Sequence, residues 1–260
     1  MANYKVVDAD QLDADLKTVA DAIREKGGTT DELAFPDGMA SAVSEIQSGG
    51  GESDATLIHF IERTQSEATT AVVPNGTKKI GSGVFNPFSN LISITLPNGL
   101  IEIGDQAFNK CSELENISLP NTLTKIGTYA FGSCQKMPLE NLPDGLTSIG
   151  ENAFRSCSNI TITTLPNGVA TLERYVFGYC TKIESFEIPS GVSTIKDSAF
   201  LSCTKLKTAT FLGVPQTLGS NAFQWCDNLT VINVPWSEGE VADAPWGATN
   251  ATINYNYVGG

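Results

Sequence analysis

Residues 114–134 read LENISLPNTLTKIGTYAFGSC, and this stretch contains every feature that decides the fold. Apolar and polar side chains alternate up to a Leu-Pro pair, and an Ile-Gly pair, an Ala-Phe pair and a cysteine follow. The same order returns every 23 residues on either side of the stretch. The repeated positions are Cys111, Cys134, Cys157, Cys180, Cys203 and Cys226, and Phe85, Phe108, Phe131, Phe154, Phe177, Phe200 and Phe223. Seven units therefore fill residues 73–233 without an insertion.

A single unit of this length cannot bury its apolar side chains alone, so the units must stack. A period of about 20 to 29 residues with few apolar anchors is typical of a leucine-rich solenoid in which one repeat is one coil. In residues 91–97, Ile94 and Leu96 alternate with polar side chains, which indicates a short strand that the final proline ends. Ala107 and Phe108 form a second apolar edge of the same coil. We expect parallel strands stacked about 4.8 Å apart.

The units resemble the BspA-like leucine-rich repeats of bacteria, whose pattern couples a strand ending in Leu-Pro to Ile-Gly and Ala-Phe. The resemblance covers about two-thirds of the chain and implies a solenoid with a binding or adhesive role, without specifying a ligand. The departures from the pattern are Pro138 inside the third strand, Leu212 for the strand-end proline, Val84 and Val176 for the alanine, and Glu173 and Lys196 for the glycine.

The six cysteines share one phase of the repeat, so their side chains should point the same way in every coil. Free cysteine is among the most buried residue types, which predicts a column of buried thiols. The same place in the first unit holds Phe88, which fits an apolar column. Partial disulfide bridging is one alternative, because stacked coils bring Cα atoms within about 5 Å. A metal site is another, although close Cys-Cys spacing is missing.

Two short amphipathic helices are predicted in residues 1–48, which we interpret as a segment for anchoring or association. The apolar faces consist of Leu12, Leu16, Val19 and Ile23, and of Met39, Val43 and Ile46. So small a module has few large apolar groups and is near the lower limit for folding alone, which favours a partner or self-association into a homo-oligomer. The alternative is a helical hairpin that folds back on the solenoid. The predicted fold class is therefore α+β, a leucine-rich repeat solenoid of seven 23-residue coils with a small N-terminal helical segment.

The segments flanking the repeats are predicted to cap them. Residues 49–72 begin with glycines and contain the alternating run LIHFIE, which indicates a linker and an N-terminal cap strand. Residues 234–260 drop the repeat and are predicted to form a C-terminal cap. This segment concentrates the aromatic residues Trp236, Trp246, Tyr255 and Tyr257. They serve as a lid or, alternatively, as a sugar-stacking site.

A candidate binding surface follows from the polar strand positions and from a more variable row just before the cysteines. Residues in the first group are Ser93, Thr95, Glu115, Asn116, Ser118, Thr164, Glu184, Glu187, Lys207 and Thr210, and those in the second are Tyr179 and Trp225. Variable polar surface over a repeated core suits recognition, but every solenoid also needs a solvated surface. The repeat therefore identifies candidate faces without naming a ligand.

Composition excludes several functions. The chain has 16 basic and 29 acidic residues, and a net charge of -13 disfavours nucleic acid. No apolar run approaches the length of a membrane span, and the N-terminus lacks the pattern of a standard secretory signal. The single histidine, His59, has no triad-like spacing around it, so we expect no catalytic residues, no cofactor and no metal.

The predicted function is that of a non-enzymatic binding or structural protein of a phage or phage-like particle. Residues 16–46 and the closing Asn-Ala-Thr-Ile-Asn-Tyr segment resemble repeat-bearing tail proteins of phages and prophages of gut bacteria. That resemblance implies a virion protein, assembled in the host cytoplasm, that joins other virion proteins through residues 1–48. Its repeats would meet a host surface protein or glycan. The alternatives are a bacterial cell-surface adhesin and a purely structural virion component.

Overall fold

The chain divides into two compact units, residues 1–53 and residues 54–260. A computed structural model describes residues 68–73 and 75–258, all of which lie in the second unit. The helices predicted in residues 1–48, the run LIHFIE and His59 lie outside the described residues. Apart from Pro74, Gly259 and Gly260, the described part contains all seven predicted units and the segment that follows them.

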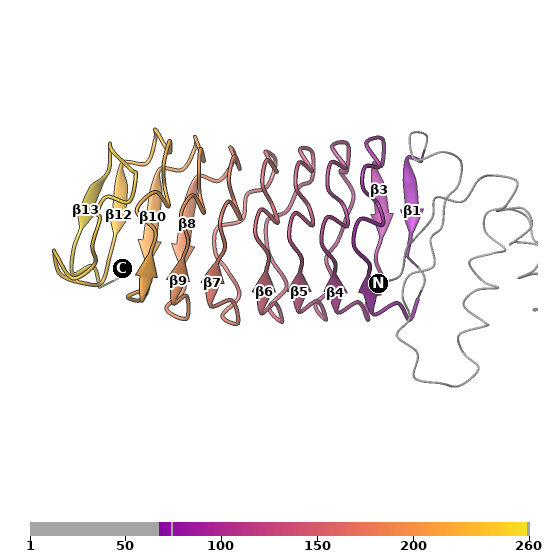
Figure 1. Ribbon diagram of the computed structural model, residues 1–260, viewed down its shortest axis with the longest axis horizontal. Coiled ribbons are helices and arrows are strands. Elements are labelled where there is room, and N and C mark those ends of the chain that lie inside the picture. The colour runs from indigo at the N-terminus through magenta and orange to yellow at the C-terminus, as the bar shows by residue number, and fades with distance from the viewer. Residues whose placement is uncertain (1–67, 74, 259–260) are drawn as a thin grey trace, which may run out of the picture. The chain divides into compact units, whose positions relative to one another are not determined.

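Short strands of successive coils form two parallel ladders (Figure 1). The first ladder contains β1 (Thr70–Val72), β3 (Ser93–Thr95), β8 (Ser185–Ile188), β10 (Thr208–Phe211), β12 (Val231–Asn233) and β13 (Thr252–Asn254). The second contains β2 (Lys79–Ile80), β4 (Glu102–Ile103), β5 (Lys125–Ile126), β6 (Ser148–Ile149), β7 (Thr171–Leu172), β9 (Thr194–Ile195) and β11 (Thr217–Leu218). The described residues include no helix, and hence none that is long and apolar enough to cross a membrane.

The strand register confirms that one repeat is one coil. Ile103 of β4 lies opposite Ile80 of β2, and Phe186 of β8 lies opposite Ala209 of β10, each pair 23 residues apart. Residues beyond the last unit add a further coil, because Ile253 of β13 pairs with β12. The solenoid therefore has about eight turns instead of the seven predicted.

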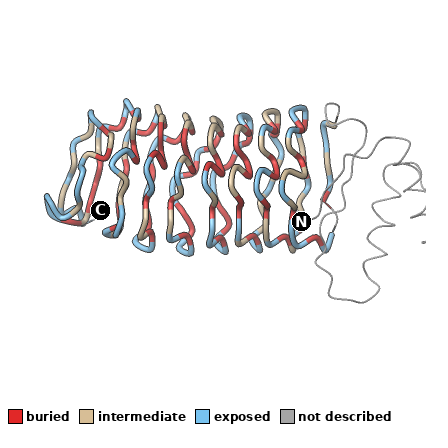
Figure 2. Tube along the Cα trace, viewed as in Figure 1, coloured by how far each residue is buried: buried red, intermediate tan, exposed pale blue. Residues whose placement is uncertain are grey.

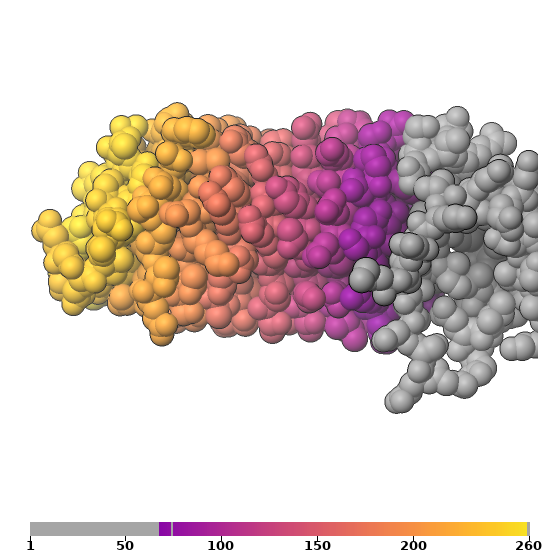
Figure 3. Space-filling view, in the orientation of Figure 1, coloured from indigo at the N-terminus to yellow at the C-terminus, as the bar shows by residue number. Residues whose placement is uncertain are grey.

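A column of phenylalanine rings runs through the centre of the coils. From Phe85 to Phe223, one ring per unit stacks on the next with centroids 5.0 to 5.8 Å apart. Ala107 and Phe108 are fully buried, as predicted for the second apolar edge. Buried and exposed stretches alternate in the same way in successive coils (Figure 2). The coils form successive bands of surface in chain order (Figure 3), so each part of the surface comes from nearby sequence.

The first ladder is interrupted between β3 and β8 (Figure 1). In regular units the first, fourth and sixth residues point inward, and Ile94 occupies the fourth place. In the units that begin at Met137 and Ile160, the third residue is buried and the fourth is exposed. Strand side chains alternate with a period of two, so this one-residue shift prevents a continuous ladder between the shifted and the regular units, and Pro138 also removes a backbone donor.

Only isolated bridges remain in this part of the described ladder. They join Ser93 to Asn116 and Thr164 to Glu187. The prediction that every unit carries a strand on this side is therefore wrong for the coils that begin at residues 114, 137 and 160.

The second ladder, which the sequence predicted only as an apolar edge, is divided between β6 and β7. Its coils approach so closely that a Cβ on Gly150 would lie 2.5 Å from a backbone nitrogen of the preceding coil. Gly150 donates its amide hydrogen to the Ile126 oxygen at 2.9 Å. Glu173 carries a Cβ at the corresponding place, and no such bond joins it to Ile149 in the described chain. Instead, Glu173 forms an ion pair with Lys196 at 2.6 Å, so two departures from the glycine pattern pair with each other.

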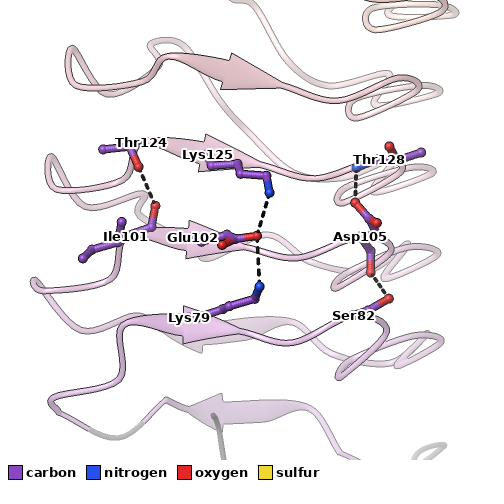
Figure 4. Close-up of polar contacts among 8 residues, drawn as sticks. All are labelled: Lys79, Ser82, Ile101, Glu102, Asp105, Thr124, Lys125 and Thr128. Atoms are coloured by element: carbon purple, nitrogen blue, oxygen red, sulfur yellow. Dashed lines mark hydrogen bonds and ion pairs between the residues drawn. The ribbon is translucent and has the colours of Figure 1, made fainter. Parts of the chain in front are cut away.

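Polar side chains along the second ladder join neighbouring coils (Figure 4). One Glu102 carboxylate oxygen lies 3.2 Å from Lys79 Nζ and 3.0 Å from Lys125 Nζ. The Asp105 carboxylate accepts a hydrogen bond of 2.8 Å from the Thr128 amide. Partial burial by itself raises the pKa of Glu102, but the hydrogen bonds and positive charges of Lys125 and Lys79 outweigh burial and lower that pKa.

We expect Glu102→Gln to lower the free energy of unfolding by about 0.5 to 1 kcal/mol at pH 7. A carboxylate whose pKa is lowered by folding contributes stability above its unfolded pKa and loses it as the pH falls through the folded pKa. The difference from the wild type should therefore disappear near pH 3. Urea denaturation at pH 7 and pH 3 measures this effect, and Glu187→Gln, whose side chain forms no ion pair in the described structure, is the control. A deficit that persists at pH 3 would contradict the assignment.

Two buried tryptophans close the last coil. Trp236 and Trp246 are 2% and 0% exposed, and their rings pack edge to face at 6.0 Å. Phe211 meets the Trp236 ring edge to face at 5.1 Å. These two tryptophans are therefore unavailable for stacking on a sugar, and that alternative is wrong for them. Tyr255 and Tyr257 remain partly exposed.

Candidate functional site

The outward side of the first ladder, including the unpaired segments between β3 and β8, is called the strand face. It carries ten of the twelve residues predicted as a binding surface, namely Ser93, Thr95, Glu115, Asn116, Ser118, Thr164, Glu184, Glu187, Lys207 and Thr210. All ten are exposed or half-buried. Because strand side chains alternate, burial of inward residues such as Ile94 and Phe186 holds their neighbours toward solvent.

Two hollows lie on the strand face where the ladder is interrupted. The first has a volume of about 480 Å³ and is lined by Glu115, Asn116, Gln135, Lys136, Pro138, Ser158, Asn159 and Lys182. The second has a volume of about 430 Å³ and is lined by Ser93, Ile94, Thr95, Leu96, Asn98, Glu115, Asn116, Ile117, Ser118 and Pro120. The hollows share Glu115 and Asn116, so we treat them as one depression and call it the polar groove.

Sequence reasoning found one end of the polar groove and missed the other. Five predicted residues line the second hollow, but Gln135, Lys136, Ser158, Asn159 and Lys182 were not singled out. Ser158, Asn159 and Lys182 lie at the ends of the two coils in which the apolar pattern shifts by one place, and Gln135 and Lys136 directly precede the first of these coils. That shift is visible in the sequence and is the signal that could have located them.

Charges on the strand face are largely paired between neighbouring coils. Lys136 Nζ lies 2.7 Å from Glu113 and 3.2 Å from Glu115, and Lys207 Nζ lies 2.8 Å from Glu184. Hydrogen bonds to Glu113 and Glu115 raise the pKa of Lys136. The hydrogen bond to Lys207 and its charge lower the pKa of Glu184. The face therefore offers hydrogen-bonding groups without a concentrated charge of one sign.

Tyr179 and Trp225 belong to a different edge of the coils and do not line the polar groove. Both have left-handed backbones, with φ of 63° and 60°, in the turn before the cysteine column. The Arg155 guanidinium lies 5.4 Å from the centroid of the Tyr179 ring. Trp225 is 57% exposed. The two predicted aromatic anchors are thus separate from the ten residues of the strand face.

The six cysteines are free and buried, which confirms the predicted thiol column. Each thiol also donates a hydrogen bond to a phenylalanine carbonyl of the preceding unit, as Cys157 does to Phe131 at 2.9 Å. Burial raises the pKa of the Cys111 thiol to about 12 and raises the pKa of Cys157 further. The reactive thiolate is therefore strongly disfavoured in the folded coils.

We expect the native thiols to react with a disulfide reagent at least about 1,000-fold more slowly than those of the unfolded chain. Burial removes both access and ionisation. The measurement is a thiol titration with and without guanidinium chloride, in which six groups should react after unfolding. Fewer than six, or any rapid native reaction, would contradict a column of buried free thiols.

These features define a class of protein, a leucine-rich repeat solenoid with an open polar face. The chain belongs to the family described as BspA type leucine-rich repeat region, which matches residues 63–139 and 136–243 in 6 copies. The comparison with curated proteins found no match.

Solved structures of bacterial leucine-rich repeat proteins are similar to this chain. A T. pallidum protein, TpLRR, has 22% sequence identity and a TM-score of 0.57, with 69% of this chain and 91% of that chain covered. A leucine-rich repeat protein from Bacteroides ovatus has 21% identity and a TM-score of 0.49, with 72% of this chain and 61% of that chain covered. This chain therefore spans less than two-thirds of the Bacteroides protein. At 22% identity the likeness to TpLRR shows the fold alone.

Proposed function

We propose that the chain is a non-enzymatic recognition protein that presents its strand face to a protein or glycan on a host cell. The observation that carries the proposal is the polar groove, which coincides with the interruption of the strand ladder. Its hydroxyl, amide and paired charged groups suit reversible hydrogen bonding. Membership of the BspA-type repeat family supports a role in adhesion or binding.

Binding of the labelled full-length chain to host cells tests this function. Thr95→Arg with Ser118→Arg places two large cations at the second hollow, and both positions are exposed. Ser148→Arg with Thr217→Arg makes the same charge change on the second ladder. We expect binding at least about tenfold weaker for the first pair and within about twofold for the control pair. Equal binding by both pairs would rule out the strand face as the contact surface.

We propose further that the chain is carried by a phage or phage-like particle, joined to other virion proteins through residues 1–48. The support is the resemblance of residues 16–46 to phage tail proteins. The alternative is a bacterial cell-surface adhesin, which the repeat family favours.

Mass spectrometry separates the two placements. Particles purified from a producing strain should contain the chain in fixed ratio to other virion proteins. Recovery in the cell-surface fraction, with none in the particles, would establish the adhesin instead.

A further inference from the structure

The polar groove lies beside backbone amides that have no backbone partner among the described residues. Between residues 115–119 and residues 138–142 no backbone hydrogen bond forms in the described structure. By contrast, β8 and β10 pair from Ser185 and Thr208 to Ile188 and Phe211. The amide hydrogens of residues 117–118 and 139–142 donate to no backbone oxygen in the described structure, and they are therefore left for water or a ligand to satisfy.

Side chains that line the first hollow both donate and accept hydrogen bonds. Asn116 and Gln135 contribute amides, each with two donor hydrogens and an acceptor oxygen, and Asn159 contributes an amide that already donates to the Lys136 oxygen at 2.9 Å. Ser158 adds a hydroxyl, and Pro138 is the one apolar residue among the described residues of the lining. A flexible peptide usually anchors through aromatic or aliphatic side chains in apolar pockets, which this hollow does not offer.

The charge of the hollow argues against a strongly anionic ligand. Lys136 is paired with Glu113 and Glu115. Lys182 donates a hydrogen bond to the Asn159 amide oxygen and has no carboxylate partner in the described part of the chain. One unpaired cation beside a carboxylate, on a chain of net charge -13, is too little to hold a polyanion.

We infer that the first hollow of the polar groove binds an uncharged saccharide chain. Each sugar hydroxyl donates and accepts at once, which matches the mixed amide, hydroxyl and backbone groups of the groove. The inference rests on the proposed function and adds the ligand class. It also accounts for the broken repeat, because local rules of a fold are most often violated where a site is built.

The inference is tested by a variant, called the repaired variant, in which the coil that begins at Met137 regains the regular apolar pattern. Pro138→Thr, Leu139→Thr and Glu140→Ile together return the inward side chain to the fourth place of the unit, as in the units of β3 and β8. This variant should restore strand pairing and fill the groove. A second variant, Gln135→Ala with Asn116→Ala, removes only lining amides of exposed side chains and keeps the local backbone. The control is Thr217→Ala, which lies on the second ladder.

The probes are uncharged gluco-, galacto-, manno- and N-acetylglucosamine oligosaccharides of three to six units. Titration of the full chain, followed by NMR, should show a Kd of about 1 mM or tighter for at least one of them. We expect a loss of at least about tenfold for the repaired variant and for the double alanine variant, and none for the control. If the repaired variant does not fold, the double alanine variant alone tests the inference, again with an expected loss of affinity of at least about tenfold.

Two results would overturn the inference: no oligosaccharide binds the wild type, or the double alanine variant binds as tightly as the wild type. Cell binding distinguishes this failure from failure of the proposed function. If the strand face still mediates attachment, and protease treatment of the cells abolishes it, the function stands and its ligand is a protein. If no cells are bound, the proposed function itself fails.

Discussion

Replacing Phe154 with alanine is expected to lower the free energy of unfolding by about 4 kcal/mol. The Phe154 ring is fully buried and stacks between Phe131 and Phe177, with centroids 5.6 and 5.8 Å away. The alanine variant leaves a cavity where the ring was. Neighbouring side chains cannot fill it, because each neighbouring coil already holds its own ring in the same column. Coils in a solenoid are stabilised mainly by their neighbours, so a cavity in the middle weakens two interfaces at once.

Urea denaturation followed by circular dichroism measures this loss. Phe154→Leu keeps an apolar side chain that fills much of the same space, and it is expected to lose less than about 1.5 kcal/mol. A loss below about 1 kcal/mol for Phe154→Ala would mean that the rings are not packed as a continuous column.

The second large effect is expected for Gly127→Ala, which should lower the free energy of unfolding by about 2 kcal/mol. A Cβ on Gly127 would lie 2.6 Å from the backbone nitrogen of Asp105 in the preceding coil. The contact is with backbone, so relief requires the two coils to move apart. The amide of Gly127 also donates to the Ile103 oxygen at 2.8 Å, and separation would weaken this bond.

Gly178→Ala is the matched control for the glycine prediction. A Cβ on Gly178 would meet the Tyr175 oxygen at 3.4 Å, an ordinary contact. Its effect should lie within about 0.5 kcal/mol of the wild type in the same denaturation assay. If both alanine variants lose the same free energy of unfolding, the backbone preference of alanine, and not the close approach of the coils, would explain the Gly127 result.

The repeat predicted the core correctly because one residue per unit repeats one environment. Once Cys111 and Cys134 are known to be in phase, both thiols must share a direction, and the structure buries them both. The Phe column follows from the same argument. Local alternation in residues 91–96 likewise predicted the strand that is observed as β3.

The sequence could not predict the second ladder as easily. Its strands are only two residues long, too short to show an alternating pattern, and their pairing depends on how closely the coils approach. The missing glycine at Glu173 does not by itself explain the break, because Lys196 also carries a Cβ at this place and its amide still donates to the Leu172 oxygen at 2.9 Å. The position of the break therefore does not follow from the glycine pattern.

For the candidate site, treating all units as equivalent hid the difference between the regular coils and the two coils with a shifted apolar pattern. Ser118 and Glu115 were found because they occupy regular polar places. Gln135 and Asn159 were missed because they directly precede the segments in which Leu139 and Ile162 are buried in place of the regular fourth residue, and this shift shows only when single coils are compared. A departure from the repeat therefore carried more information about the site than the repeat itself.

Hydrogen exchange of backbone amides tests most directly whether the strand ladder is interrupted at the polar groove. We predict that amides of residues 117–118 and 139–142 exchange at least about 100-fold faster than those of β8 and β10, because the former have no backbone acceptor in the described chain. Equal protection across all coils would contradict this account, since it would mean that the ladder continues through the groove.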